Sequence, residues 1–398
     1  MKPFLSFSLF VLLVACGGRP SSRPPDTVSS DPAKTGSGPS APSPSPGDPA
    51  DTDGGDGIEP ASGETIYPHI LPASGQGALR VTHTFTFEDR SLRITVDIPR
   101  GLIAGAALSP RHSLTRGNRD ADWRARYNLA FINDPMQEDF YDAVLGELRR
   151  LKVTHRLDSD RYAELIVSMV QHIEYDTQAE GDARFPVETF ATKRGDCDDK
   201  SRLLAGLLAR EGYGVATLHF SQENHMAVGI RANDMEYRKT GYAYIETTSP
   251  SMIGFPFEDG ADVHLTTVPD AFPIGNGTIR YTAAHEVKYL ADTFARLEER
   301  IRTDSAALDA RNRRCEEAAR RVSEGQAAVR AAKNAPADEL NRHIGAYNRA
   351  VDEYNDEVVK QKQMAQELNR LIEVRNDIAA HPADRYNTFR RVKQKLED

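Results

Sequence analysis

A cysteine stands at the point where a loop turns into a predicted helix. Cys197 opens a run over 197–210 with apolar residues at helical spacing, and Asp196 before it is a good N-cap residue. At a helix N-terminus, unpaired backbone N–H groups and the helix dipole favour a thiolate over a thiol. Because the thiolate is the nucleophilic form of cysteine, this position suits covalent catalysis. The alternative is a small buried cysteine that begins a helix.

A histidine and a carboxylate follow in positions that could complete such a site. His225 heads a predicted strand over 224–230, and Glu246 lies near the end of the next predicted strand, 242–248. If the two strands pair antiparallel with His225 opposite Glu246, the two side chains meet on one face. Glu246 could then fix one imidazole tautomer while the other ring nitrogen faces Cys197, which is a nucleophile, base and orienter arrangement.

Other residues compete for these roles. His219, on a predicted strand over 215–220, is the competing base, and Asp234 in the loop after His225 is the substitute acid. Asp198 and Asp199 are also candidate site residues, although acidic charge at a helix start is favourable for structural reasons alone. Tyr175 could line the site or donate to an oxyanion, or it could belong to the core.

Residues 173–250 resemble the core of the transglutaminase-like superfamily of papain-type thiol enzymes. The matching segments are 173–176, 185–190, 194–199, 225–229 and 244–248. The resemblance implies a papain-like α+β fold with an antiparallel sheet, Cys197 as acyl-accepting nucleophile, His225 as base and Glu246 as the acid that orients the histidine. One departure from the family pattern is the third residue, which is most often Asp and is Glu here.

The N-terminus reads as a targeting segment. Residues 1–16 contain a positive start, a short apolar run and the sequence Leu13-Val14-Ala15-Cys16, which resembles the lipobox of bacterial lipoproteins. The resemblance implies lipidation of Cys16 and a protein anchored to a membrane of the bacterial cell envelope, on its periplasmic or extracytoplasmic side. The alternative is an ordinary signal peptide cleaved near Ala15.

The remaining composition divides the chain into further segments. Residues 17–63 are rich in Pro, Ser, Gly and Asp and predict a disordered linker, because they have little apolar surface to bury. A transglutaminase-like domain is expected over 64–284, with its core at 136–255. Alternating residues over 78–103 predict two strands, with His83 on their polar face, and helices are predicted over 137–151 and 158–173.

The last third of the sequence has a seven-residue apolar repeat. Two repeat series lie on either side of a break at Pro336, which predicts an antiparallel coiled-coil hairpin over 285–380. Cys315 falls on an apolar stripe and is expected to be packed rather than reactive. The hairpin could be a spacer, a docking surface for a protein partner or a seam for self-association. Residues 381–398 are predicted to be a basic, solvated helix end.

Composition narrows the function further. A formal charge of −9 argues against nucleic acid as the main partner. The three cysteines fall in different segments, so a disulfide framework is not expected, and zinc-ligand spacing is absent. We therefore expect an envelope-anchored thiol enzyme without cofactor or metal, acting by acyl transfer or amide hydrolysis on a peptide or protein. The alternative is a catalytically silent binding module on a coiled-coil docking protein.

Overall fold

The computed structural model describes residues 65–115, 122–176, 183–255 and 265–397. These residues are a mixture of helices and antiparallel strands, as the sequence predicts, and form two compact units. One unit is globular and contains the described residues up to 293 together with 377–397; the other is helical and spans 294–376. The predictions for 1–63, including lipidation of Cys16, lie outside the described residues.

Most strands of the globular unit pair antiparallel. Their bounds are β1 (Thr65–Ile66), β2 (Ala78–Phe87), β3 (Arg90–Pro99), β4 (Leu114–Thr115), β5 (Glu174–Tyr175), β6 (Arg194–Gly195), β7 (Val215–Phe220), β8 (His225–Ile230), β9 (Ala243–Ile245) and β10 (Asp270–Ile274). The central sheet has four strands in the order β10-β7-β8-β9, all antiparallel. The short pair β5–β6 is parallel and places Tyr175 beside Gly195, two residues before Cys197.

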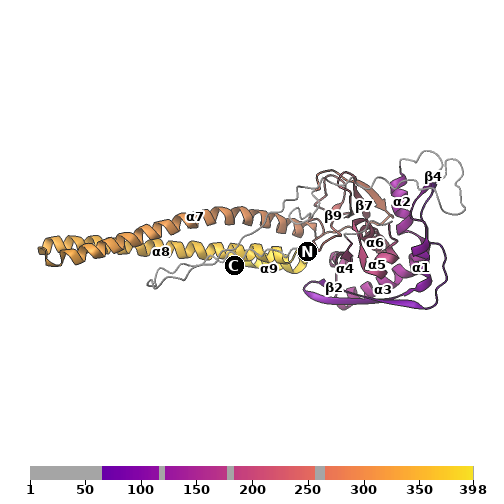
Figure 1. Cartoon of the computed structure of the whole chain (residues 1–398), viewed down its shortest axis with the longest axis horizontal. Coiled ribbons are helices and arrows are strands. Elements are labelled where there is room, and N and C mark those ends of the chain that lie inside the picture. The colour runs from indigo at the N-terminus through magenta and orange to yellow at the C-terminus, as the bar shows by residue number, and fades with distance from the viewer. Residues whose placement is uncertain (1–64, 116–121, 177–182, 256–264, 398) are drawn as a thin grey trace, which may run out of the picture. The chain divides into compact units, whose positions relative to one another are not determined.

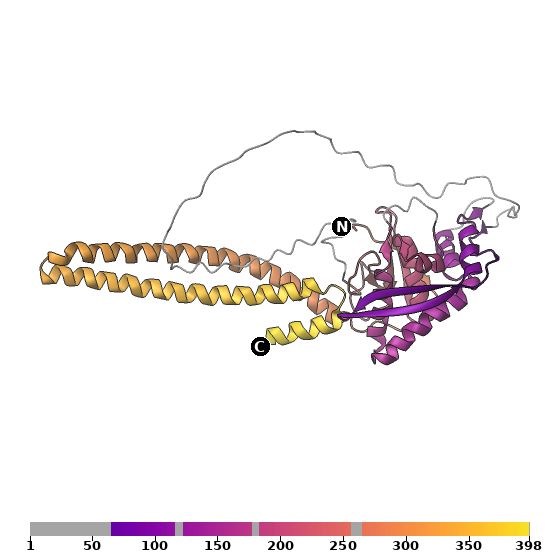
Figure 2. The same ribbon diagram turned by 60° about the horizontal axis from the view of Figure 1, so that its bottom comes forward.

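Strands β2 and β3 form a long two-stranded ribbon (Figure 2). Alternate residues of each strand are buried, because successive side chains point to opposite faces and one face packs on helices α3 (Glu138–Thr154) and α4 (Ser159–Gln171). The prediction that His83 is solvated is wrong. His83 lies on the buried face with Val81 and Phe85, and its Nε2 atom is 2.8 Å from the Met169 carbonyl oxygen.

The remaining helices of the globular unit surround the central sheet. They are α1 (Arg100–Leu108), α2 (Trp123–Ile132), α5 (Pro186–Thr192) and α6 (Cys197–Arg210), with a short 3-10 turn at Pro135–Gln137. Residues 199–208 of helix α6 are all buried. The helix packs against β7 and β8 on one side and against α2, α4 and α5 on others. This packing fixes the first turn of α6 relative to the start of β8.

The helical unit is an antiparallel hairpin. It consists of most of α7 (Ala284–Ala331) and α8 (Ala337–Ala380), separated by a 3-10 turn at Ala332–Asn334, and Figure 1 shows the two helices side by side. Ion pairs join Arg311 to Glu357 at 2.6 Å and Arg321 to Glu353 at 3.1 Å. Because the partner number falls as the α7 number rises, the helices run in opposite directions.

The core of the hairpin comes from the predicted repeat. Leu308, Ala365 and Leu368 form a buried cluster, with Ile301 and Ile372 packed against it. Cys315 is also buried. The apolar stripes that the sequence repeats every seven residues therefore meet along the length of these two helices.

The C-terminal segment differs from its prediction. Residues Arg385–Glu397 form helix α9, which belongs to the globular unit and has Arg385, Thr388 and Val392 buried. Arg385 Nε donates to Glu164 Oε1 of α4 at 2.7 Å. The segment is therefore not a solvated helix end, because a buried ion pair and an apolar side chain hold it against the domain. Among the described helices, none combines the length and apolar character needed to span a bilayer.

Candidate active site

Cys197 is the first residue of α6, as the sequence predicts. The Asp196 side chain caps the helix by accepting from the Asp199 backbone N–H at 2.9 Å. The Cys197 side chain is 8% exposed, and its sulfur lies 3.5 Å from Asp198 Oδ1, to which the thiol donates. The nucleophile candidate is thus at a helix N-terminus but nearly enclosed.

The environment of the thiol opposes its ionisation. Burial raises the pKa of Cys197, and the carboxylates of Asp198 and Asp196 raise it further, while a hydrogen bond from the Met226 backbone N–H acts in the opposite direction. The sulfur therefore rests as a thiol. This differs from the thiolate that the helix position alone predicts, because desolvation and two neighbouring carboxylates outweigh the helix dipole.

His225 and Glu246 lie together, but not directly opposite each other. The β8–β9 ladder pairs Val228 with Ile245, so continuing its register places Glu246 opposite Ala227 and leaves His225 as its diagonal neighbour. Diagonal neighbours are farther apart than opposed residues but remain within reach of long side chains. The His225 Nε2 and Glu246 Oε2 atoms are 3.8 Å apart. A glutamate spans this diagonal with one more methylene than an aspartate has.

Tyr244 bridges the two residues. Its hydroxyl donates to Glu246 Oε2 at 2.7 Å and lies 3.3 Å from His225 Nε2. Since the hydroxyl proton is used on the carboxylate, the phenolic oxygen can only accept from the ring, which places the imidazole proton on Nε2. The Nδ1 atom is then the basic nitrogen, and it has no hydrogen-bond partner among the described residues.

Glu246 is held as an anion. Its Oε1 atom accepts from the Thr247 and Thr248 backbone N–H groups and from the Thr248 hydroxyl, each at 2.8 Å. Burial would raise the pKa of Glu246, but the nearby His225 and these donors more than offset it, so the pKa of this carboxyl lies below its ordinary value. An ionised carboxylate is what an orienting acid requires.

A buried polar brace connects the cysteine helix to the glutamate. Lys200, one turn after Cys197, is fully buried and its Nζ donates to the Gln171 and Ile173 carbonyls at 3.1 and 2.8 Å. Gln171 Nε2 in turn donates to the Glu246 carbonyl at 2.8 Å. Burial lowers the pKa of Lys200 to about 8, and the charge of Glu246 offsets only part of this lowering. The brace therefore fixes α6, the end of α4 and the end of β9 to one another.

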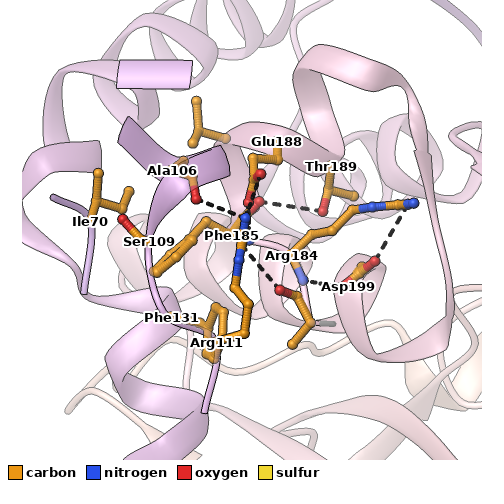
Figure 3. A network of polar contacts seen from close by, with 12 residues as sticks. Ile70, Ala106, Ser109, Arg111, Phe131, Arg184, Phe185, Glu188, Thr189 and Asp199 are labelled. Carbon is orange, nitrogen blue, oxygen red and sulfur yellow. Dashed lines mark hydrogen bonds and ion pairs between the residues drawn. The ribbon is translucent and has the colours of Figure 1, made fainter. Parts of the chain in front are cut away.

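A second polar network supports the first turn of α6 from the other side (Figure 3). Asp199 Oδ1 accepts from the Arg184 backbone N–H at 2.8 Å, and the Arg184 guanidinium lies 3.6 Å from its other oxygen. Arg111 makes a bidentate pair with Glu188 at 2.6 and 2.8 Å and also donates to the Ala183 carbonyl at 3.1 Å. The residues before α5 are thereby tied to the helix that carries Cys197. Asp199 has a structural role here.

The competing candidates make other contacts. His219 Nε2 lies 3.1 Å from Asn128 Nδ2, and burial lowers its pKa. Asp234 lies in the loop after Ile230, and that end of β8 is about 17 Å from His225 at 3.3 Å per residue. Tyr175 is 38% exposed, and its pKa is raised by partial burial and by the nearby carboxylates of Asp196 and Asp198. It is the exposed aromatic residue beside the thiol.

The structure thus brings His225 and Glu246 together with Tyr244, and it places Met226, the neighbour of His225, beside the Cys197 sulfur. The pKa of Tyr244 is raised by burial and by the charge of Glu246. A thiol, an imidazole with a basic nitrogen and an anchored carboxylate can perform nucleophilic acyl chemistry. Sequence analysis missed Tyr244, although its position two residues before Glu246 on a strand puts both on one face.

The described residues hold no group of three or more His, Cys, Asp and Glu side chains arranged for a metal ion. No protein-family model, no curated protein and no solved structure matches this chain.

Proposed function

We propose that this protein is a transglutaminase-like thiol enzyme that performs acyl transfer or amide hydrolysis through a Cys197 thioester on a peptide or protein. The observation that carries the proposal is the orientation of His225. Its Nε2 side is occupied by Tyr244 and Glu246, which leaves Nδ1 without a hydrogen-bond partner among the described residues and available to act as the base. Met226, the next residue, donates its backbone N–H toward the Cys197 sulfur.

The reaction would begin from a thiol rather than from a preformed thiolate. As the sulfur attacks the substrate carbonyl carbon, its proton passes to His225 Nδ1 and the carbonyl oxygen becomes an oxyanion. The Cys197 backbone N–H, at the start of α6, is the donor placed for that oxyanion. His225 then returns the proton to the leaving amine, the C–N bond breaks and a thioester remains. Water or a second amine resolves the thioester with His225 again as base.

Tyr244 and Glu246 stabilise the charged intermediate of this cycle. When His225 gains a proton it becomes an imidazolium, and its Nε2–H faces the Tyr244 hydroxyl, which is itself bonded to the Glu246 carboxylate. Because all three side chains are at least nine-tenths buried, the negative charge of Glu246 is only partly screened by water. In the same proposal, lipidation of Cys16 anchors the enzyme to an envelope membrane, and the α7–α8 hairpin serves a protein partner or self-association.

One observation favours the alternative, a catalytically silent binding module. The Cys197 thiol donates to Asp198, is 8% exposed, and has its pKa raised by burial and by two carboxylates. In that case the same residues would hold the fold together without turning over a substrate.

Alkylation of Cys197 by iodoacetamide separates the two functions. The rate would be measured against pH by mass spectrometry for the wild type, Cys197→Ala and His225→Ala, with Cys315 as the internal reference thiol. For an enzyme, His225→Ala should slow the alkylation of Cys197 at least tenfold at neutral pH. Equal rates in the wild type and His225→Ala would refute the proposed base and leave the binding module.

A further inference from the structure

An open cavity lies at the end of β8 opposite to His225. Residues 231–236 and 240–243 line it together with Arg280, and its volume is about 630 Å³. A smaller cavity of about 240 Å³ shares the Arg231 and Tyr242 walls. Sites for small ligands have volumes of roughly 300–1,000 Å³. The larger cavity is therefore of the right size for a ligand, and the length of β8 separates it from the thiol.

Arg231 is exposed, lines both cavities and has no charged partner among the described residues. Its stem passes Gly214, a wall of the smaller cavity, where a Cβ atom would lie only 2.7 Å from Arg231 Cδ. Its guanidinium carbon lies 5.9 Å from the centre of the Tyr242 ring. Within the described part of the chain, the guanidinium has neither a hydrogen-bond nor an ion-pair partner. An unpaired guanidinium is suited to bind a carboxylate or another oxyanion through two parallel hydrogen bonds.

The other charged residues of the cavity limit which charged ligands it can bind. Asp234 and Glu236 line it, and the hydrogen bonds of their carboxylates are to backbone N–H groups of the same loop, those of Met235 and Gly241. Arg280 is already engaged, because it donates to Asn233 Oδ1 at 2.9 Å and to the Ala232 carbonyl. A multiply charged anion would be repelled by the two carboxylates, and a cation without an acid group would leave Arg231 unpaired. A ligand that carries both charges matches the site.

We propose that this cavity binds a short peptide with free termini, its α-carboxylate at Arg231 and its α-ammonium at Asp234 and Glu236. The assignment rests on the cavity, the unpaired guanidinium and the carboxylates, and it does not depend on the thiol chemistry proposed above. Tyr242 adds an aromatic edge beside the bound carboxylate, and the smaller cavity beyond it has room for a side chain.

Titration calorimetry on the full chain tests this site. The chain would carry Cys197→Ala, so that no probe is consumed, and the probes would be tetra-alanine with free termini, its C-terminal amide and its N-acetyl form. Saturable binding of the free peptide is expected, at least tenfold tighter than that of either blocked form. Arg231→Gln should remove the preference for the free carboxylate. Arg149→Gln, which removes a half-exposed arginine that pairs with Glu211 on another surface, should change no affinity.

A second variant keeps the test decisive if Arg231→Gln does not fold. Asp234→Asn with Glu236→Gln retains the oxygen acceptors of both side chains and should abolish only the preference for a free ammonium. Three results would overturn the proposal: no saturable binding of tetra-alanine in the millimolar range, unchanged affinity in the Arg231 and the double variant, or equal affinity for inorganic phosphate. Equal affinity for free alanine would overturn the assignment to a peptide.

Discussion

The hydroxyl of Tyr244 is the group whose removal tests the proposed site most directly. Tyr244→Phe deletes a donor to Glu246 Oε2 at 2.7 Å and an acceptor for His225 Nε2 at 3.3 Å, and it leaves the ring in place. The carboxylate oxygen is then left with His225 Nε2 at 3.8 Å as its nearest charged neighbour. Both groups stay buried, so water does not replace the lost hydroxyl without rearrangement.

The magnitude follows from the charge on Glu246. A hydrogen bond to a charged group contributes about 1.5–3 kcal/mol to the free energy of unfolding. We therefore expect Tyr244→Phe to lower that free energy by about 2 kcal/mol at pH 7. The same loss should slow His225-dependent alkylation of Cys197 by about tenfold or more, since about 1.4 kcal/mol corresponds to one factor of ten.

The effect should depend on pH in a defined direction. The pKa of Glu246 is lowered in the folded protein, so its ionised form contributes stability that is present above the unfolded carboxyl's pKa, near 4.5, and is lost as pH falls through the folded value. Tyr244→Phe removes one of the causes of this lowering. The difference in stability between wild type and variant should therefore shrink as pH falls through the folded value, because the remaining neutral hydrogen bond contributes only about 1 kcal/mol.

Urea unfolding followed by tryptophan fluorescence measures this difference. The chain has a single tryptophan, Trp123 in α2, so its emission reports on the globular unit and not on the hairpin. Tyr141→Phe is the matched control, because the Tyr141 hydroxyl is equally buried but has no hydrogen-bond partner among the described residues. The reasoning is refuted if Tyr244→Phe destabilises the protein no more than Tyr141→Phe at pH 7.

Three further changes probe other parts of the structure. Asp198→Asn should lower the raised pKa of Cys197 and speed its alkylation several-fold at pH 8, measured by mass spectrometry; an unchanged rate would exclude Asp198 as a cause. The pKa of Lys200 is lowered to about 8 from an ordinary 10.5, so between these pH values the unfolded chain keeps a proton that the folded protein has lost. At 1.36 kcal/mol per pH unit, the wild type should therefore become about 3 kcal/mol more stable as the pH rises through this range. Lys200→Met should abolish this gain in urea titrations, and a persistent gain would contradict the assignment. Arg385→Met should destabilise the globular unit by about 3–5 kcal/mol because Glu164 stays buried and unpaired, whereas Arg385→Met with Glu164→Gln should recover part of the loss. A double variant no more stable than the single one would argue against that pairing.

Local patterns predicted most of the elements that carry the site. The cap at Asp196, the start of α6 at Cys197 and strands β7 and β8 follow from residues that are close in sequence. The hairpin follows from a seven-residue repeat. Its first helix begins at Ala284 and its second helix ends at Ala380, within a residue of the expected bounds at 285 and 380. These features are predictable because helix periodicity, strand alternation and capping depend on neighbouring residues.

Long-range features were predicted less well. The prediction that His83 lies on the polar face of the ribbon was wrong. A histidine on an alternating strand can point either way, and only the packing of α4 shows which face is buried. The solvated end predicted for 381–398 was wrong because the partner of Arg385 is 221 residues away, on α4. Charge in a sequence predicts exposure on average, but not which charges find a buried partner.

The sequence by itself determined the residue types of the site, their order along the chain and the elements that carry them. The tertiary structure decided how they meet. The diagonal approach of Glu246 to His225, and the hydroxyl of Tyr244 between them, depend on strand register. The raised pKa of Cys197 depends on burial and on the carboxylates around it. Register and desolvation arise from segments packed together in space, and for that reason no local pattern contains them.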